Sequence, residues 1–198
     1  MFTKNYYRNS IISSKFKAPR FKADGKTIDF YHSGIDIVDT KLAPIYSILD
    51  GTLFHAEKDH KMYGNFVIIK HNLSYLNPPT PIIIYSLYAH LHTINVSKAE
   101  TFIKSGTVIG SMGNTGNCWT LDKGSWRPIA LQEKNDPNCQ LGVHLHLDIY
   151  SNTNDNNLME RLKKDVNFDE YNDTVNQWNK NYYDPMKIIN WLEITTKG

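Results

Sequence analysis

The segment Gly142-Val143-His144-Leu145-His146-Leu147-Asp148-Ile149-Tyr150 decides the fold class of this chain. Its side chains alternate with period two between an apolar face and a polar face, as in a β-strand. The apolar face carries Val143, Leu145, Leu147 and Ile149, and the polar face carries His144, His146, Asp148 and Tyr150. A strand of this kind is typical of an antiparallel sheet that covers a core.

Further strand patterns lie on the N-terminal side of this segment. Residues 43–53 predict a short strand, an Asp50-Gly51 turn and the start of a second strand. Apolar and β-branched runs at 66–69 and 82–91 predict two more strands. On the C-terminal side, residues 184–192 fit a short amphipathic helix with Pro185 in its first turn. We therefore expect a mainly β protein with one antiparallel sheet and a minor helix at the C-terminal end.

Two segments interrupt the strand pattern. Residues 117–141 are polar and lack periodicity, which predicts a long surface loop. Residues 151–181 are rich in asparagine and look helical only around residues 158–166.

Composition limits the function classes. A chain of 198 residues and 22.9 kDa with 40% hydrophobic residues favours one globular domain. A formal charge of +2 gives no argument for nucleic acid, and no apolar run is long enough for a membrane span. The first 20 residues contain no apolar core of a signal peptide. Residues 1–22 carry six basic residues and no acid, which fits either a solvated arm or an arm that binds a polyanion.

A candidate pair of metal ligands lies in His32-Ser33-Gly34-Ile35-Asp36. On an extended strand, His32 and Asp36 share one face. Gly34 lies between them and leaves a gap in which an ion could sit. A histidine and a carboxylate are suitable ligands for zinc, although a surface histidine and aspartate near a turn would give the same pattern.

Two His-x-His pairs could complete such a site. His144 and His146 share the polar face of their strand, and one of them would supply the third ligand of a catalytic zinc while the other acts in proton transfer. His90 and His92 form the second pair, and periodicity alone does not say which pair binds metal. The remaining histidines, His55, His60 and His71, are expected at the surface.

Together, these motifs resemble those of the lysostaphin-type (LytM-like) zinc endopeptidases. His32-x-Gly34-Ile35-Asp36, Tyr88-Ala89-His90-Leu91 and Gly142-x-His144-Leu145-His146 follow one another in the order of that family. Tyr63-Gly64-Asn65 and Gly113-Asn114-Thr115-Gly116 resemble its connecting turns. The resemblance spans roughly residues 30–150.

The resemblance implies a β-sheet with a substrate groove and a division of roles among five residues. His32, Asp36 and His146 would bind Zn²⁺, while His144 and His90 would be catalytic, flanking the attacking water and the scissile carbonyl. His92 matches no functional position. All five positions are present, whereas members of the family that only bind typically lose some of them.

The activity implied is that of a peptidase that cuts peptide bonds in bacterial peptidoglycan, acting at the cell wall. The alternatives are a non-catalytic module that binds cell wall or activates another hydrolase, and a part of a phage tail or secretion apparatus. A monomer is favoured, and the bond that is cut is left open.

This chain departs from the family pattern in residues 117–141, which we expect to form part of the groove wall. Cys118 and Cys139 lie near the two ends of this segment, and a disulfide between them and two free thiols are equally compatible with the sequence. A zinc role for either cysteine is not expected.

We divide the chain into an N-terminal basic arm and first groove wall (1–29), a peptidase core (30–150), and an Asn-rich insertion with the C-terminal helix (151–198).

Overall fold

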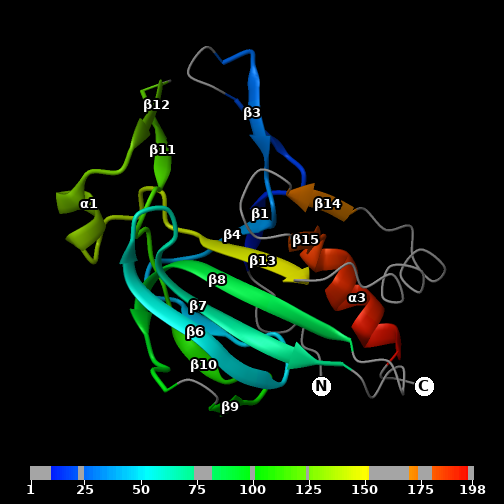
Figure 1. Ribbon diagram of the computed structural model, residues 1–198. Helices are drawn as coiled ribbons and strands as arrows, with labels where there is room; N and C mark the ends of the chain where they lie inside the picture. The colour runs from blue at the N-terminus through cyan, green and yellow to red at the C-terminus, as the bar shows by residue number, and fades with distance from the viewer. Residues whose placement is uncertain are drawn as a thin grey trace.

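The computed structural model describes residues 10–21, 25–73, 82–98, 101–123, 125–151, 170–173 and 180–195. Within them, one large antiparallel sheet forms the body of the molecule (Figure 1). Its strands are β1 (Ile11–Ser14), β4 (Ile35–Val38), β5 (Pro44–Tyr46), β6 (Gly51–His60), β7 (Gly64–Asn72), β8 (Ile83–Ile94), β9 (Phe102–Ile103), β10 (Val108–Met112), β13 (Leu145–Ser151), β14 (Glu170–Asp173) and β15 (Lys180–Tyr183). The expected fold class is confirmed.

The strand order places β13 near the centre of the sheet. The main path runs β1-β4-β13-β8-β7-β6-β9, with β15 also paired to β13 and β10 paired to both β8 and β5. Strands β4 and β8 therefore flank β13 on its two sides. This arrangement brings together the three segments in which the sequence motifs lie.

Buried side chains lie on both faces of the sheet. One cluster of buried side chains includes Leu145, Leu147 and Ile149 of β13, as the alternation predicts. A second cluster, which contains Leu87 and Tyr150, lies on the opposite face. The polar face of β13 is thus mostly buried rather than solvated, so its polar groups need partners inside the protein.

Helix α3 (Pro185–Thr195) begins at Pro185, as predicted. The carboxylate of Asp184 accepts a hydrogen bond from the Met186 amide at 3.0 Å, which satisfies an amide at the start of the helix. Ile188 and Ile189 join the same core cluster as the apolar side of β13. Of the helices that the structure describes, none is long and apolar enough to cross a membrane.

The prediction of a structureless loop at 117–141 is wrong. The segment contains a hairpin of β11 (Trp119–Asp122) and β12 (Ser125–Pro128), followed by helix α1 (Leu131–Asn135). Arg127 joins these elements, because its guanidinium donates to Asp122 at 2.8 Å and to both carboxylate oxygens of Glu133 at 2.7 Å. The hairpin was missed because its strands are short and its apolar residues are exposed.

A second hairpin, formed by β2 (Pro19–Phe21) and β3 (Ile28–Tyr31), lies before β4. In Figure 1 this hairpin and the β11–β12 hairpin both extend beyond the same end of the main sheet. Within the segment described above as the N-terminal arm, residues 11–14 form β1, which pairs with β4.

The surface prediction for His71 is also wrong. Its side chain is fully buried, with Nδ1 donating to the Asp50 carbonyl at 2.9 Å and Nε2 lying 2.7 Å from Ser86 Oγ. Burial lowers the pKa of His71 to about 4. His55 is exposed and His60 half-buried. The helix expected around residues 158–166 lies outside the described residues.

Candidate metal centre

The first group of site residues is assembled by the pairing of β4 with β13. In this register, His146 lies directly opposite Asp36, and His32 precedes β4 by three residues. His32 Nε2 lies 2.9 Å from His146 Nδ1 and 3.0 Å from Asp36 Oδ1, and His146 Nδ1 lies 3.1 Å from the same oxygen. One potential ligand atom from each of His32, Asp36 and His146 therefore faces the same point, although His32 and His146 are 114 positions apart in the sequence.

The size of this triangle fits zinc. Ligand atoms about 2.0–2.1 Å from a tetrahedral zinc ion lie roughly 3.3 Å from one another. The observed separations of 2.9–3.1 Å require only a small outward movement of the donors. Two imidazoles and one carboxylate also match the chemistry of catalytic zinc sites, which leave a fourth position open.

The outer nitrogens of both ligand histidines are held by acceptors. His32 Nδ1 donates to the Lys15 carbonyl at 3.0 Å, so its Nε2 is the nitrogen left with a lone pair. His146 Nε2 donates to Asp148 Oδ1 at 2.9 Å, so Nδ1 is the nitrogen that would give up its proton and bind a metal. This is the pattern that orients metal-binding histidines in proteins.

The charges in this group are strongly coupled. Burial acts to raise the pKa of Asp36, but its close side-chain contacts with the rings of His146 and His32 outweigh burial and hold the pKa well below its usual range. Burial opposes the charged form of His146, yet Asp148 and Asp36 raise the pKa of its ring to about 10. A metal ion at this place would replace the proton that the ring shares with these carboxylates.

Arg20 of β2 is a contact that the sequence did not reveal. Its Nη2 donates to Asp36 Oδ2 at 2.8 Å, on the oxygen that faces away from the two histidines. Asp36 therefore directs one oxygen at the candidate metal position and the other at a guanidinium, an arrangement that fixes the plane of the carboxylate.

Gly34 has a different role from the one expected. A β-carbon there would lie 2.2 Å from the Leu147 carbonyl oxygen and 2.4 Å from Asp148 Oδ1. The space beside Gly34 is thus filled by β13 and is no gap for an ion. Glycine is required because β4 and β13 approach each other closely at the point where Asp148 supports His146.

A β-bulge in β8 brings His90 to the face of the sheet that carries His146. Tyr88 and Leu91 both belong to the same core cluster although they are three residues apart, so the alternation shifts between them. His90 has a φ of 63°, which is uncommon for a residue other than glycine. The bulge turns its side chain toward β13, where its ring centroid lies 4.6 Å from that of His144.

His90 and His144 are both tied to backbone carbonyls through Nδ1. His90 Nδ1 donates to the Thr115 carbonyl at 2.8 Å, and His144 Nδ1 donates to the Gly142 carbonyl at 2.9 Å. Burial lowers the pKa of both rings, and for His90 the neighbouring His144 and His146 lower it further. Each neutral ring therefore offers the lone pair of Nε2, and His144 Nε2 lies 3.9 Å from Asp36 Oδ1.

The turn at residues 113–116 positions His90. Thr115 supplies the carbonyl that holds the ring, while its hydroxyl accepts from the Asn65 amide at 2.9 Å and donates to the Leu91 carbonyl at 2.8 Å. Gly64 and Gly116 both have positive φ and pack backbone against backbone. These turns, quoted above for their resemblance, thus connect β7, β8 and the loop that leads to β11.

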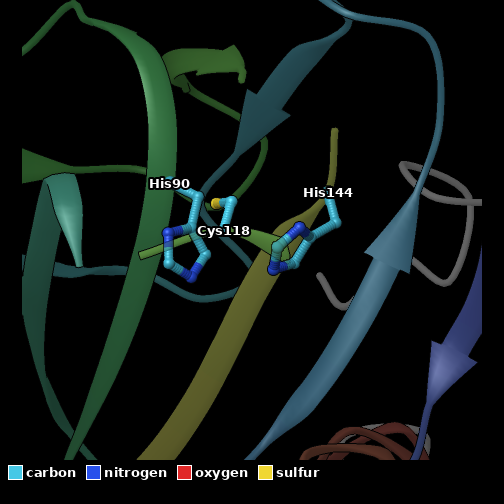
Figure 2. A group of neighbouring side chains, drawn as sticks. All are labelled: His90, Cys118 and His144. Carbon is cyan, nitrogen blue, oxygen red and sulfur yellow. The ribbon is translucent and has the colours of Figure 1, made fainter. Parts of the chain in front are cut away.

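Cys118 is the residue that sequence reasoning missed. Cys118 and Cys139 are free thiols, so the disulfide alternative is not realised in this structure. Cys118 is buried beside His90 and His144 (Figure 2). His92 is half-buried and belongs to neither of the two groups of candidate metal ligands that the described residues form.

The fold and this arrangement define a class: a lysostaphin-type β-sheet domain with a cluster of two histidines and an aspartate suited to a metal, flanked by two further histidines. The chain belongs to peptidase family M23, whose family model matches residues 30–158.

Curated relatives are similar over about half of the chain. The murein hydrolase activator NlpD of Salmonella dublin is 35% identical over 114 residues, which cover 54% of this chain and 28% of that protein. NlpD of Escherichia coli K12 is 35% identical over 107 residues, which cover 51% of this chain and 26% of that protein. The matched part of the chain thus spans about a quarter of the length of these relatives.

Among solved structures, the catalytic domain of the antimicrobial peptidase lysostaphin from Staphylococcus simulans is similar, with a TM-score of 0.52 and 20% identity. The similarity covers 82% of this chain and 99% of that domain. It shows that the two share a fold.

Proposed function

We propose that this chain is a zinc-dependent endopeptidase that hydrolyses peptide bonds in bacterial peptidoglycan. The observation that carries the proposal is the triangle of His32 Nε2, Asp36 Oδ1 and His146 Nδ1, with sides of 2.9–3.1 Å, beside two neutral histidines. A site that only binds a polymer needs neither the converging donors nor the flanking bases.

His32, Asp36 and His146 would hold the ion. When bound, zinc acts as a Lewis acid that activates water and polarises a peptide carbonyl. Asp148 keeps His146 in the tautomer that presents Nδ1, and the Lys15 carbonyl keeps His32 in the tautomer that presents Nε2.

His144 is the general base in this proposal. Its Nε2 carries a lone pair because Nδ1 donates to the Gly142 carbonyl, and the lowered pKa of the ring keeps it neutral near pH 7. The ring accepts a proton from the attacking water at Nε2 and returns that proton to the leaving amine.

His90 is the second catalytic histidine. In its neutral form its Nε2 is an acceptor, because Nδ1 is held by the Thr115 carbonyl. To donate a hydrogen bond to the negative oxygen of the tetrahedral intermediate, the ring would first take up a proton from solvent at Nε2. The centroids of the His90 and His144 rings lie 4.6 Å apart, so one proton acceptor and one proton donor can serve the same reaction centre.

The substrate class comes from the family resemblance and from the name of the murein hydrolase activators to which the chain is similar. Peptidoglycan peptides at the bacterial cell wall are therefore the proposed substrate and site of action. The same name supports the second candidate function, a non-catalytic module that activates another hydrolase. The presence of all five site positions favours the enzyme.

The test compares four proteins for zinc content and for release of new amino groups from purified peptidoglycan. The wild type is expected to hold about one zinc per chain and to cleave, while Asp36→Ala loses both properties. His144→Ala is expected to keep its zinc and to lose cleavage by at least about 100-fold. His92→Ala, a histidine outside the proposed machinery, should behave as wild type. Zinc-loaded protein that never cleaves would favour the activator function.

A further inference from the structure

Cys118 is a buried thiol that the proposed peptidase mechanism does not use. It lies immediately before β11, while His90 lies on β8 and His144 immediately before β13. Figure 2 shows the three side chains close together, each on a separate segment. One donor atom from each residue lies within 4.8 Å of those of the other two.

The two histidines already have the outer contacts of metal ligands. A carbonyl oxygen holds Nδ1 of each ring at 2.8 Å and 2.9 Å, and Nε2 of each ring retains its lone pair. In metal sites, the nitrogen that does not bind the ion is usually fixed by an acceptor in this way. For His90, the acceptor is the Thr115 carbonyl, which also accepts from Cys118 Sγ at 3.3 Å.

The thiol gives the group a preference among metals. Burial raises the pKa of Cys118 to about 12, so without an ion it is a protonated thiol 1% exposed to solvent. Such a thiol is a poor nucleophile. A thiolate with two imidazoles favours thiophilic ions over Mg²⁺ or Ca²⁺.

We infer that His90, Cys118 and His144 form a second metal site, for a thiophilic ion such as Zn²⁺ or Cd²⁺, next to the His32–Asp36–His146 site. Binding is a coordination step without electron transfer: the thiol releases its proton to the buffer, and sulfur and the two ring nitrogens donate lone pairs to the ion. The donor atoms lie within 4.8 Å of one another, whereas those of a tetrahedral zinc site lie roughly 3.3–3.6 Å apart, so binding would draw the three side chains closer by up to about 1.5 Å.

The location of this site has a regulatory consequence, which rests on the proposed function. An ion bound to His90 and His144 occupies the lone pairs that the peptidase needs for proton transfer. A second equivalent of thiophilic metal therefore inhibits the enzyme while the first remains in place.

The experiment uses protein loaded with one equivalent of zinc and titrated with Cd²⁺. It records the ultraviolet charge-transfer absorption of a cadmium–thiolate bond, bound cadmium and retained zinc per chain, and peptidoglycan cleavage. The proteins are wild type, Cys118→Ser and, as the matched control, Cys139→Ser. Wild type and Cys139→Ser are expected to take up one cadmium with the thiolate absorption, to retain zinc and to lose cleavage. Cys118→Ser should lose the absorption, bind the second ion at least about tenfold more weakly and resist inhibition accordingly.

The inference is overturned if wild type shows no thiolate absorption, or if the absorption disappears in Cys139→Ser and persists in Cys118→Ser. The wild type and Cys139→Ser decide the outcome even if Cys118→Ser does not fold. A thiolate absorption in a protein that never cleaves peptidoglycan would support the second site and count against the proposed peptidase. Cleavage that cadmium inhibits equally in wild type and Cys118→Ser would count against the second site alone.

Discussion

Asp148 connects the fold to the proposed metal chemistry at the scale of a single residue. It is fully buried, and its Oδ1 accepts from both His146 Nε2 at 2.9 Å and Ser33 Oγ at 3.0 Å. Its negative charge therefore supports His146 as a ligand, and Ser33, two residues before β4, anchors the carboxylate.

We expect Asp148→Asn to weaken zinc binding by about 10–100-fold, because the neutral amide is a poorer acceptor for His146. Competition with a chromogenic chelator measures this change. Asp39→Asn, which alters a carboxylate outside the cluster, should leave zinc affinity unchanged. Equal affinity in Asp148→Asn and wild type would show that Asp148 does not support the ligand.

At the scale of elements, the approach of β4 to β13 controls the register that pairs Asp36 with His146. We expect Gly34→Ala to separate these strands, since its β-carbon would meet backbone of β13 at 2.2 Å. The predicted effects are a loss of roughly 1–3 kcal/mol in the free energy of unfolding and weaker zinc binding. Denaturant unfolding and chelator competition measure them.

Gly25→Ala is the comparison for this change. Gly25 has open space around its β-carbon position and a φ of 65°, so the substitution costs only about 1–2 kcal/mol of backbone strain. Zinc affinity in Gly25→Ala should equal that of wild type. If Gly34→Ala also bound zinc normally, the close packing of the two strands would not govern the site.

The β11–β12 hairpin is the element proposed to form a groove wall and shape substrate choice. Trp119 and Pro128 are paired across the hairpin, so an Asn-Gly turn can replace residues 120–127. The shortened protein should bind zinc normally but cleave with altered preference among peptidoglycan crosslinks or with lower turnover. Unchanged preference and turnover would exclude this role.

The sequence predicted the regular strands better than the elements that interrupt them. Alternation in residues 142–150 correctly identified the apolar side of β13, because a strand with one core face imposes period two. His90 could not be placed in this way, since the bulge in β8 shifts the alternation. Cys118 reaches the site through a turn whose geometry depends on contacts with β7, which are distant in the sequence.

At the scale of the whole molecule, His71 is expected to make stability depend on pH. Its ring is neutral in the folded protein, since burial lowers its pKa from 6.5 to about 4. Between pH 6.5 and about 4 the unfolded chain binds a proton at this histidine and the folded protein does not. The contribution of His71 to stability is therefore complete above pH 6.5 and is lost as the pH falls through this window, by about 3 kcal/mol in total.

Unfolding by denaturant at a series of pH values measures this effect. In His71→Gln the free energy of unfolding should fall less steeply between pH 6.5 and 4, whatever its value at neutral pH. His55→Gln, a change at an exposed histidine, should keep the wild-type pH dependence. Identical slopes in His71→Gln and wild type would refute the assignment.

The motifs predicted which residues would gather, but they did not predict that buried side chains lie on both faces of the sheet or that His71 is fully buried. Burial is set by contacts between elements far apart in the chain, and the local pattern around His71 resembles that of a strand end at the surface.

If this domain itself breaks a peptide bond, as proposed, the products of its reaction with peptidoglycan reveal it. Purified peptidoglycan would be digested with the zinc-loaded chain alone, and the released fragments identified by mass spectrometry. We predict fragments that have gained one water across a peptide bond, with an intact glycan backbone, and none with Asp36→Ala. Fragments that form only when a separate hydrolase is added would contradict the proposed peptidase activity and show that the chain is an activator.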